Sequence, residues 1–176
     1  GAGFIGSHVV RLFINKYPEY QIYNLDTLTY AGNLENLKDI ENQSNYSFEH
    51  ADINNPEQID AAFKKHHITD VIHLAAESHV DRSIDGPGQF VQTNVVGTFN
   101  VMEAARRHEV DHLLMASTSS IYGANADMPY AETHRTDLPL TLYAATKKAA
   151  EAMSHSYAHL WDLPTTMFRF FTVYGP

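Results

Sequence analysis

Segments of strand length alternate with segments of helix length along the whole chain, and this alternation restricts the fold more than any other feature. Short apolar runs predict strands at residues 21–25, 46–50, 70–75, 112–117 and 165–171. Apolar residues at helical spacing predict helices at residues 4–17, 34–40, 56–65, 89–107 and 140–160. Strands that alternate with helices form βαβ units, and right-handed crossovers then build a parallel sheet covered on both faces. We therefore expect an α/β fold with a doubly wound parallel sheet of the Rossmann type.

The chain opens in a glycine-rich turn, Gly1-Ala-Gly-Phe-Ile-Gly6, which leads directly into the first predicted helix. The spacing G-x-G-x-x-G provides a tight turn, lets the backbone approach a pyrophosphate and allows close helix packing. Asp26 ends the next predicted strand, where a carboxylate would bind a ribose and repel a 2′-phosphate, so the pattern predicts NAD in preference to NADP. Asp52 ends the following strand and is a candidate for the adenine amino group. The plainer alternative for each aspartate is a solvated strand end or a helix cap.

The expected sheet is incomplete at its centre. A dinucleotide-binding glycine turn follows the first, central strand of such a sheet, and no predicted strand stands before Gly1. Without that strand, two neighbouring strands lack their shared partner. At the other end, Gly175 and Pro176 form a turn that leads onward. We therefore expect residues 1–176 to be one Rossmann domain, cut at both ends from a longer gene product.

A group of polar residues in the second half of the chain predicts catalysis. Tyr143 and Lys147 are four residues apart on a predicted helix and therefore share one face. An ammonium beside a phenol lowers the pKa of the phenol from about 10, which makes the tyrosinate a usable base. The run Ser117-Thr-Ser-Ser120 follows a predicted strand, at the edge where ligands of open parallel sheets bind. The plainer alternatives are a half-buried aromatic side chain and a polar loop or helix cap.

Composition argues against several other classes of function. The formal net charge of −9 disfavours non-specific binding to nucleic acid, which needs clustered Lys and Arg. The chain has no cysteine, which excludes disulfides and thiolate chemistry. Its 11 histidines are scattered without the spacing of metal ligands, so we expect no metal site. Apolar runs are only strand-sized and no signal peptide is visible, so we expect a cytoplasmic protein with no membrane segment.

The order of these motifs resembles that of the extended short-chain dehydrogenase/reductase family acting on nucleotide sugars. The resemblance covers nearly all 176 residues. It implies bound NAD, the catalytic residues Thr118, Tyr143 and Lys147, and a structural role for Asn94. It also implies that a smaller C-terminal domain, which binds most of the nucleotide half of the substrate, is absent here. The cofactor-binding residues that it implies are Gly1, Gly3, Phe4, Ile5, Gly6, Asp26, Asp52, Ile53, Leu74, Ala75, Ala76, Tyr143 and Lys147.

Within that family the sequence resembles two kinds of enzyme. Residues 28–33 and 75–84 are similar to the dTDP-glucose 4,6-dehydratases. The segments similar to the UDP-glucuronate 4-epimerases are residues 117–130, 142–148 and 169–176. Dehydratases place an Asp and a Glu after the catalytic Thr, and Ser119 and Ser120 stand at those positions. A hydroxyl cannot supply the acid and base that loss of water needs, whereas two serines, with Thr172 as a third donor, could bind a substrate carboxylate.

The sequence therefore predicts an NAD-dependent 4-epimerase of a nucleotide sugar, with UDP-glucuronate as the favoured substrate. In the mechanism that the resemblance implies, Tyr143 removes the C4 hydroxyl proton with the help of Thr118, and Lys147 holds the nicotinamide ribose. Two alternatives stay open: a dTDP-glucose 4,6-dehydratase, and a catalytically silent dinucleotide-binding fragment. The expected partners are the nucleotide sugar and a second copy of the protein in a homodimer.

Overall fold

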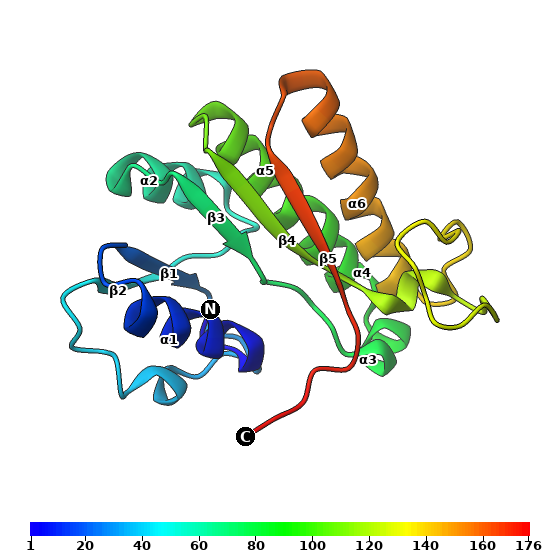
Figure 1. The fold of residues 1–176 in the computed structure, drawn as a ribbon, viewed down its shortest axis with the longest axis horizontal. Coiled ribbons are helices and arrows are strands. Elements are labelled where there is room, and N and C mark those ends of the chain that lie inside the picture. The colour runs from blue at the N-terminus through cyan, green and yellow to red at the C-terminus, as the bar shows by residue number, and fades with distance from the viewer.

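The computed structural model describes all residues from Gly1 to Pro176, and its strands form two parallel sheets (Figure 1). In the first sheet, β1 (Ile22–Asp26) pairs with β2 (Tyr46–His50). In the second, β4 (His112–Thr118) lies between β3 (Asp70–His73) and β5 (Thr165–Phe170). Because every pairing is parallel, the carboxyl ends of the strands in each sheet lie at one edge. These sheets confirm the predicted α/β class with parallel strands.

Helices connect the strands, and some of them begin at a side-chain cap. The helical segments are α1 (Phe4–Lys16), η1 (Leu34–Leu37), α2 (Pro56–His66), α3 (Val80–Asp85), α4 (Pro87–Val91), η2 (Gln92–Gly97), α5 (Thr98–Arg107), η3 (Ser119–Tyr122) and α6 (Leu142–Trp161). The Asn55 side chain caps α2, and Pro56 supplies the fixed backbone angle of its first turn. α5 packs against both α2 and α6, and α6 also packs against β4 and β5 (Figure 1). The long helices therefore cover the second sheet and connect it to α2.

The predicted helix at residues 89–107 is confirmed as a stretch that is helical without a break, but it begins at Pro87 and contains a π-helical turn (η2) between α4 and α5, which the sequence did not predict. The sequence prediction also missed α3, which ends at Gly86 just before Pro87 opens α4. Within η2, the Asn94 side chain bonds to the backbone of Glu77, in the loop after β3. That contact joins residues 17 positions apart, so helical periodicity alone could not predict it.

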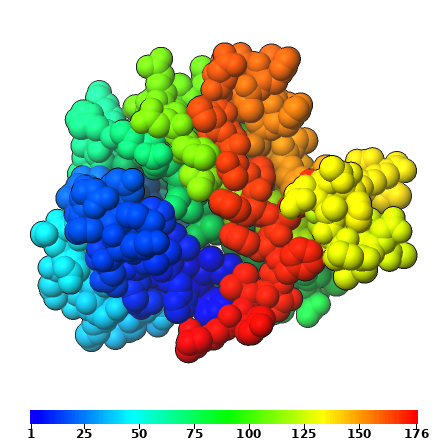
Figure 2. Space-filling model, in the orientation of Figure 1, coloured from blue at the N-terminus to red at the C-terminus, as the bar shows by residue number.

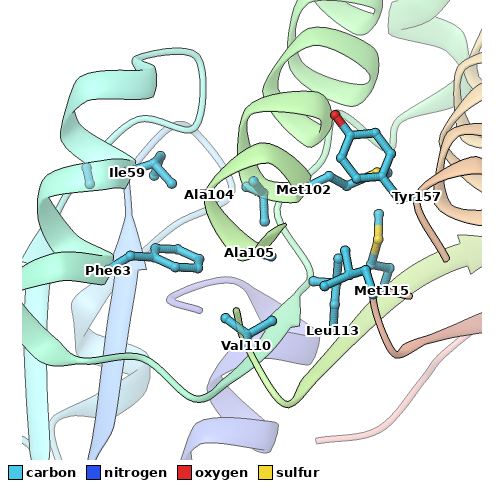
Figure 3. Packing of buried hydrophobic residues seen from close by; sticks show 12 residues of the cluster. Ile59, Phe63, Met102, Ala104, Ala105, Val110, Leu113, Met115 and Tyr157 are labelled. Atoms are coloured by element: carbon cyan, nitrogen blue, oxygen red, sulfur yellow. The ribbon is translucent and has the colours of Figure 1, made fainter. Parts of the chain in front are cut away.

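The buried hydrophobic side chains form two clusters. In the larger one, Ile59 and Phe63 of α2 face Ala104 and Ala105 of α5, with Leu113 of β4 below them (Figure 3). The smaller cluster lies around α1 and consists of Ala2, Val10, Ile14, Leu37 and Ile40. Burial of these side chains supplies the main driving force for folding. The two clusters are separate, but Ala51, just after β2, belongs to the larger cluster and Leu25 of β1 packs against it, so that cluster supports both sheets.

The surface carries one projecting segment, the loop between η3 and α6, which stands out at one side of the molecule (Figure 2). Hydrogen bonds within the loop hold it together: the Tyr122 hydroxyl donates to the Ala131 carbonyl, and the Tyr130 hydroxyl donates to that of Asn125. None of the helices combines the length and the apolar character needed to cross a bilayer.

Candidate active site

The glycine-rich turn is so tight that its last position accepts only glycine. Gly6 is buried, and a Cβ atom there would stand 2.7 Å from the Cα atom of Gly1. Gly3 caps α1 and is more open, since a Cβ atom on it would meet the Ala31 carbonyl oxygen at 3.4 Å. The first turn of α1 continues with the exposed Phe4 and the half-buried Ile5. The first N–H groups of α1 have no partner within the helix, which suits this end for binding an anionic group.

Asp26 lies beside this turn, as the sequence predicts, at the end of β1. Its Oδ2 atom accepts hydrogen bonds from the Gly1 amino group at 2.8 Å and the Ala2 N–H at 2.9 Å. Its Oδ1 atom accepts the Leu28 N–H at 2.8 Å. Partial burial alone would raise the pKa of this carboxyl, but these donors outweigh burial and hold the pKa below its ordinary value. Asp26 is therefore ionised at neutral pH.

The other expected cofactor residues lie in loops after β2 and β3. Asp52 uses Oδ1 to accept the Asn54 N–H at 2.9 Å, which fits a turn-capping role, and its contact with adenine stays a prediction. Ile53 packs closely against the π-helical turn: a Cβ atom on Gly97 would stand 2.7 Å from its side chain. The segment Leu74-Ala-Ala76 follows β3, with Ala75 exposed and its two neighbours half-buried.

The structure brings Thr118 and Tyr143 together. Thr118 is the last residue of β4, and Tyr143 lies in the first turn of α6, where the Thr141 side chain accepts the Ala144 N–H. The Thr118 hydroxyl is close enough to the phenol to act on its pKa. The same hydroxyl donates to the Ser120 Oγ atom at 3.2 Å. A strand end and a helix start thus place two hydroxyl groups side by side.

The expected lowering of the Tyr143 pKa is wrong for this structure. Burial raises the pKa of the phenol, and the hydrogen-bonding influence of Thr118 lowers it only in part. Lys147 is not among the groups that act on it. The physical reason is that the phenol is removed from water, which disfavours the anion, while no charge close enough compensates.

Lys147 is buried within α6, with 5% of its surface exposed. Its ammonium makes no hydrogen bond or ion pair within the chain. Burial lowers the pKa of this ammonium to about 8, and Glu151 opposes the change. The side chain is buried as a whole, and the three donors of its ammonium have no acceptor in the chain, so they are available for a ligand with hydroxyl groups.

Two interactions near the site were not predicted from the sequence. Glu151 accepts two hydrogen bonds from the Arg169 guanidinium, both at 3.0 Å, and one from the Ser117 hydroxyl at 2.6 Å. The spacing of four residues between Lys147 and Glu151 on one helix was a signal that could have found the carboxylate. Arg169 lies on β5, and no local pattern indicates its pairing with α6.

Asn94 proves to be fully buried and connects three segments. Its side chain both accepts from and donates to the backbone of Glu77, each at 2.8 Å, and donates to the Thr146 hydroxyl at 3.1 Å. Thr146 lies next to Lys147 on α6 and donates to the Tyr143 carbonyl. Asn94 therefore ties the loop after β3 to the helix that carries Tyr143.

The predicted substrate residues lie at the same edge of the second sheet. Ser119 and Ser120 begin the 3-10 helix that follows β4, and both are half-buried. Thr172 follows β5 and is exposed. Neighbouring parallel strands place their carboxyl ends together, and Thr118 pairs with Phe170 in the register of β4 and β5. Nowhere do three His, Asp or Glu side chains converge in a way that could hold a metal ion.

The arrangement defines a class of protein: a parallel-stranded nucleotide-binding fold with a Thr at a strand end and a Tyr and Lys on the following long helix. A family model described as GDP-mannose 4,6 dehydratase matches residues 1–176. The chain belongs to this family, within the extended short-chain dehydrogenases/reductases that comprise nucleotide-sugar epimerases and dehydratases.

Curated relatives include both kinds of enzyme. A protein named as a probable UDP-glucuronate 4-epimerase, from Rhizobium meliloti, is 42% identical over 179 residues, which cover 99% of this chain and 52% of the relative. A dTDP-glucose 4,6-dehydratase from Escherichia coli is 39% identical over 200 residues, covering 100% of this chain and 53% of the relative. The chain thus spans about half the length of the curated relatives it matches.

The similar solved structures also include both dehydratases and epimerases. A dTDP-glucose 4,6-dehydratase from Streptomyces venezuelae, with NAD bound, superposes with a TM-score of 0.90 at 34% identity and covers 96% of this chain and 53% of its own. A UDP-glucose 4-epimerase from Thermus thermophilus, also with NAD, gives a TM-score of 0.88 at 32% identity and covers 99% and 54%. The fold is therefore the Rossmann-type fold of these NAD-binding proteins.

Proposed function

We propose that the full-length protein catalyses NAD-dependent 4-epimerisation of a nucleotide sugar, with UDP-glucuronate as the favoured substrate. One observation carries this choice: Ser119 and Ser120 follow Thr118, where the dehydratases that this chain resembles have an Asp and a Glu. Elimination of water needs groups that exchange protons near neutral pH, and a serine hydroxyl does not. The site therefore has the groups for oxidation and reduction at C4 and lacks those for dehydration.

The residues of this chain fit NAD. The turn at Gly6 has no room for a side chain, which is what close approach to a pyrophosphate requires. Asp26 is ionised and suits a ribose diol rather than a 2′-phosphate. Lys147 offers a buried ammonium without acceptors, suited to the hydroxyls of a second ribose. When bound, NAD supplies the hydride acceptor and donor for C4 of the sugar.

Tyr143 and Thr118 would handle the proton of the C4 hydroxyl. Tyr143 would act as the phenolate: it would take this proton as the sugar is oxidised to a 4-keto form, and the resulting phenol would return the proton after the keto sugar has rotated in the site. Thr118 would share the proton through its hydroxyl, which already lies beside the phenol. Burial raises the pKa of the Tyr143 phenol in this structure, so formation of the phenolate would need a positive charge brought close to it, and the Lys147 ammonium, one turn further along α6, would be that charge in the complex with substrate and NAD.

Ser119, Ser120 and Thr172 would bind the substrate carboxylate. Each hydroxyl can donate one hydrogen bond, and the three residues follow neighbouring parallel strands. Hydrogen bonds to a carboxylate are stronger than those to a neutral group, so this set would favour a uronic acid over a neutral hexose. We also propose that residues 1–176 form the NAD-binding domain, and that the remainder of the full-length protein binds the nucleotide.

The alternative is a dTDP-glucose 4,6-dehydratase, favoured by the similarity of residues 28–33 and 75–84 to that group. Incubation of the full-length protein with UDP-glucuronate and, separately, dTDP-glucose, followed by NMR of the products, decides between them. We expect UDP-galacturonate from the first substrate and no reaction with the second. A 4-keto-6-deoxy sugar from dTDP-glucose would contradict the proposal, and no reaction with either would favour a catalytically silent protein.

A further inference from the structure

A half-buried ion pair connects the helix that carries Tyr143 and Lys147 to the edge strand of the second sheet. The Nε and Nη2 atoms of Arg169 on β5 donate to the two carboxylate oxygens of Glu151 on α6, each at 3.0 Å. The Glu151 side chain is 9% exposed and that of Arg169 is 21% exposed. Burial alone would raise the pKa of the Glu151 carboxyl, but the bonds from Arg169 and Ser117 hold it below its ordinary value. A two-bonded pair of this kind fixes the carboxylate in place as an anion.

The same carboxylate reaches the strand end that carries Thr118. The buried Ser117 hydroxyl donates to the Oε1 atom of Glu151 at 2.6 Å. Ser117 directly precedes Thr118, and the Thr118 hydroxyl is the group beside the phenol. The contact between Ser117 and Glu151 therefore sets how the end of β4 lies against α6.

Glu151 also lies one helical turn beyond Lys147, on the same face of α6. The other titratable group on which the Lys147 charge acts is His73 of β3, and Tyr143 lies one turn before Lys147 on α6. Burial lowers the pKa of His73 to about 3 and raises that of Tyr143, so both are neutral at pH 7. The charged neighbours of Glu151 itself are Arg169 and, at 3.8 Å, Lys148.

We propose that Glu151 is a positioning residue of this active site: it holds the Thr118 strand end through Ser117 and supplies the negative charge that faces the buried Lys147 ammonium. The inference rests on the proposed function only where that function assigns Thr118, Tyr143 and Lys147 to the chemistry. Glu151 bonds to Ser117 and Arg169 and is not one of the residues that we assign to the sugar or to the cofactor. Its effect passes through the two residues that it holds.

The electrostatic half of the proposal is tested by titrating Lys147 directly, without substrate. The full-length protein is labelled with lysine carrying ¹³C at Cε, and the Lys147 signal is assigned by its loss in Lys147→Arg. In Glu151→Gln, the midpoint of the Lys147 titration should move to lower pH by about one unit. The matched control is Glu103→Gln, since Glu103 also pairs with an arginine, on α5 rather than in this cluster. An unchanged midpoint in Glu151→Gln, or an equal shift in Glu103→Gln, overturns the proposal.

Loss of the carboxylate leaves Arg169 without its partner, so Glu151→Gln could fail to fold. The double variant Glu151→Gln/Arg169→Gln then answers the same question, because two neutral amides can bond to each other. Arg169 is not among the groups that act on the Lys147 pKa. The midpoint should therefore fall in the double variant as well. A midpoint equal to that of the parent protein would contradict the proposal.

The positioning half is tested at Ser117, whose replacement leaves the carboxylate in place. Ser117→Ala should keep the Lys147 midpoint and lower kcat several-fold at an unchanged KM, measured with the nucleotide sugar that product NMR identifies. Ser117→Thr keeps a hydroxyl and should restore turnover. Full activity in Ser117→Ala would contradict the claim that Glu151 positions the Thr118 strand end through Ser117. Failure of the protein to epimerise any sugar would count against the proposed function, and the Lys147 titration would still decide the role of Glu151.

Discussion

At the scale of single residues, Lys147 is suited to bind a ligand but lowers the stability of the folded protein. Its ammonium is almost fully buried and has no acceptor in the chain, and burial lowers its pKa to about 8. A buried charge of this kind destabilises the folded protein, and a carboxylate one turn away offsets only part of the effect. An apolar side chain would pack there without that penalty. The residue therefore makes physical sense as a ligand-binding group rather than as part of the core.

The first prediction is that Lys147→Met stabilises the protein without cofactor at pH 7. In the unfolded chain this ammonium has a pKa of 10.5, and in the folded chain about 8. Below pH 8 both states are charged, so the penalty of burying the charge is fully present, and it disappears as the pH rises from 8 to 10.5. The difference corresponds to about 3 kcal/mol. Urea unfolding of both proteins at pH 7 and pH 10 should show a gain that shrinks at high pH; a gain that is independent of pH would contradict it.

The second prediction concerns Tyr143. Tyr143→Phe keeps the ring, which contacts Phe90 edge to face, and removes the hydroxyl. Turnover should fall by roughly 10²- to 10⁴-fold, the range expected for loss of a general acid–base group. NAD affinity, measured by calorimetry, should be retained, because the glycine turn and Asp26 lie elsewhere. A variant with near-normal turnover would show that Tyr143 only packs.

The third prediction concerns the two serines after Thr118. In Ser119→Asp/Ser120→Glu, two carboxylates would face the substrate carboxylate, repel it and remove its donors. Epimerisation of UDP-glucuronate should be lost, as read from the ratio of galacturonate to glucuronate products. The control Ser119→Thr/Ser120→Thr keeps both hydroxyls and should retain the reaction. Unimpaired epimerisation by the acidic variant would exclude these serines from the substrate site.

At the scale of secondary-structure elements, local sequence patterns were sufficient to predict those elements that are determined by their own sequence. All five strands lie within two residues of their predicted bounds, because short apolar runs between polar turns form strands in most contexts. Two features of residues 80–107 were not predicted: the short helix α3, which Gly86 and Pro87 separate from α4, and the π-helical turn, within which Asn94 contacts Glu77. Such a contact between distant residues leaves no periodic signal.

The fourth prediction is that Asn94→Ala destabilises the protein by about 2 to 4 kcal/mol. The substitution leaves the N–H and carbonyl of Glu77 buried without partners, and each such group costs about 1 to 3 kcal/mol. Asn100→Ala is the matched control, since that amide donates one hydrogen bond, to the Ile53 carbonyl. Urea unfolding should show a clearly larger loss for Asn94→Ala. Equal losses would mean that the π-helical turn holds its shape without this side chain.

At the scale of the whole molecule, the sequence was a better guide to which residues are neighbours than to the energies of their interactions. Thr118 and Tyr143 come together because β4 ends beside the start of α6, and Lys147 lies one turn further along the same helix. The direction of the Tyr143 pKa was predicted wrongly, because it depends on how much protein covers the phenol. The pairing of Glu151 with Arg169 depends on α6 packing against β5, which no local pattern specifies.

The two sheets leave one side of β1 and one side of β3 without a partner, because β1 pairs only with β2 and β3 only with β4. Asn24, in the middle of β1, is buried and its Oδ1 atom has no hydrogen-bond donor. In a doubly wound sheet, a central strand lies between two such strands. We propose that the full-length protein supplies this strand and joins the two sheets.

The fifth prediction follows from that proposal and is tested by amide hydrogen exchange. Amides of β1 and β3 should exchange about tenfold more slowly, or slower still, in the full-length protein than in a chain of residues 1–176 alone, which corresponds to about 1.4 kcal/mol in local opening free energy. Amides of β4 are the internal control, because β4 already has a partner on each side and its local pairing would not change. Slower exchange confined to β1 and β3 places the new strand between them. Equal exchange of β1 and β3 in the two proteins would mean that the sheets stay separate in the full-length protein, and would contradict the proposal.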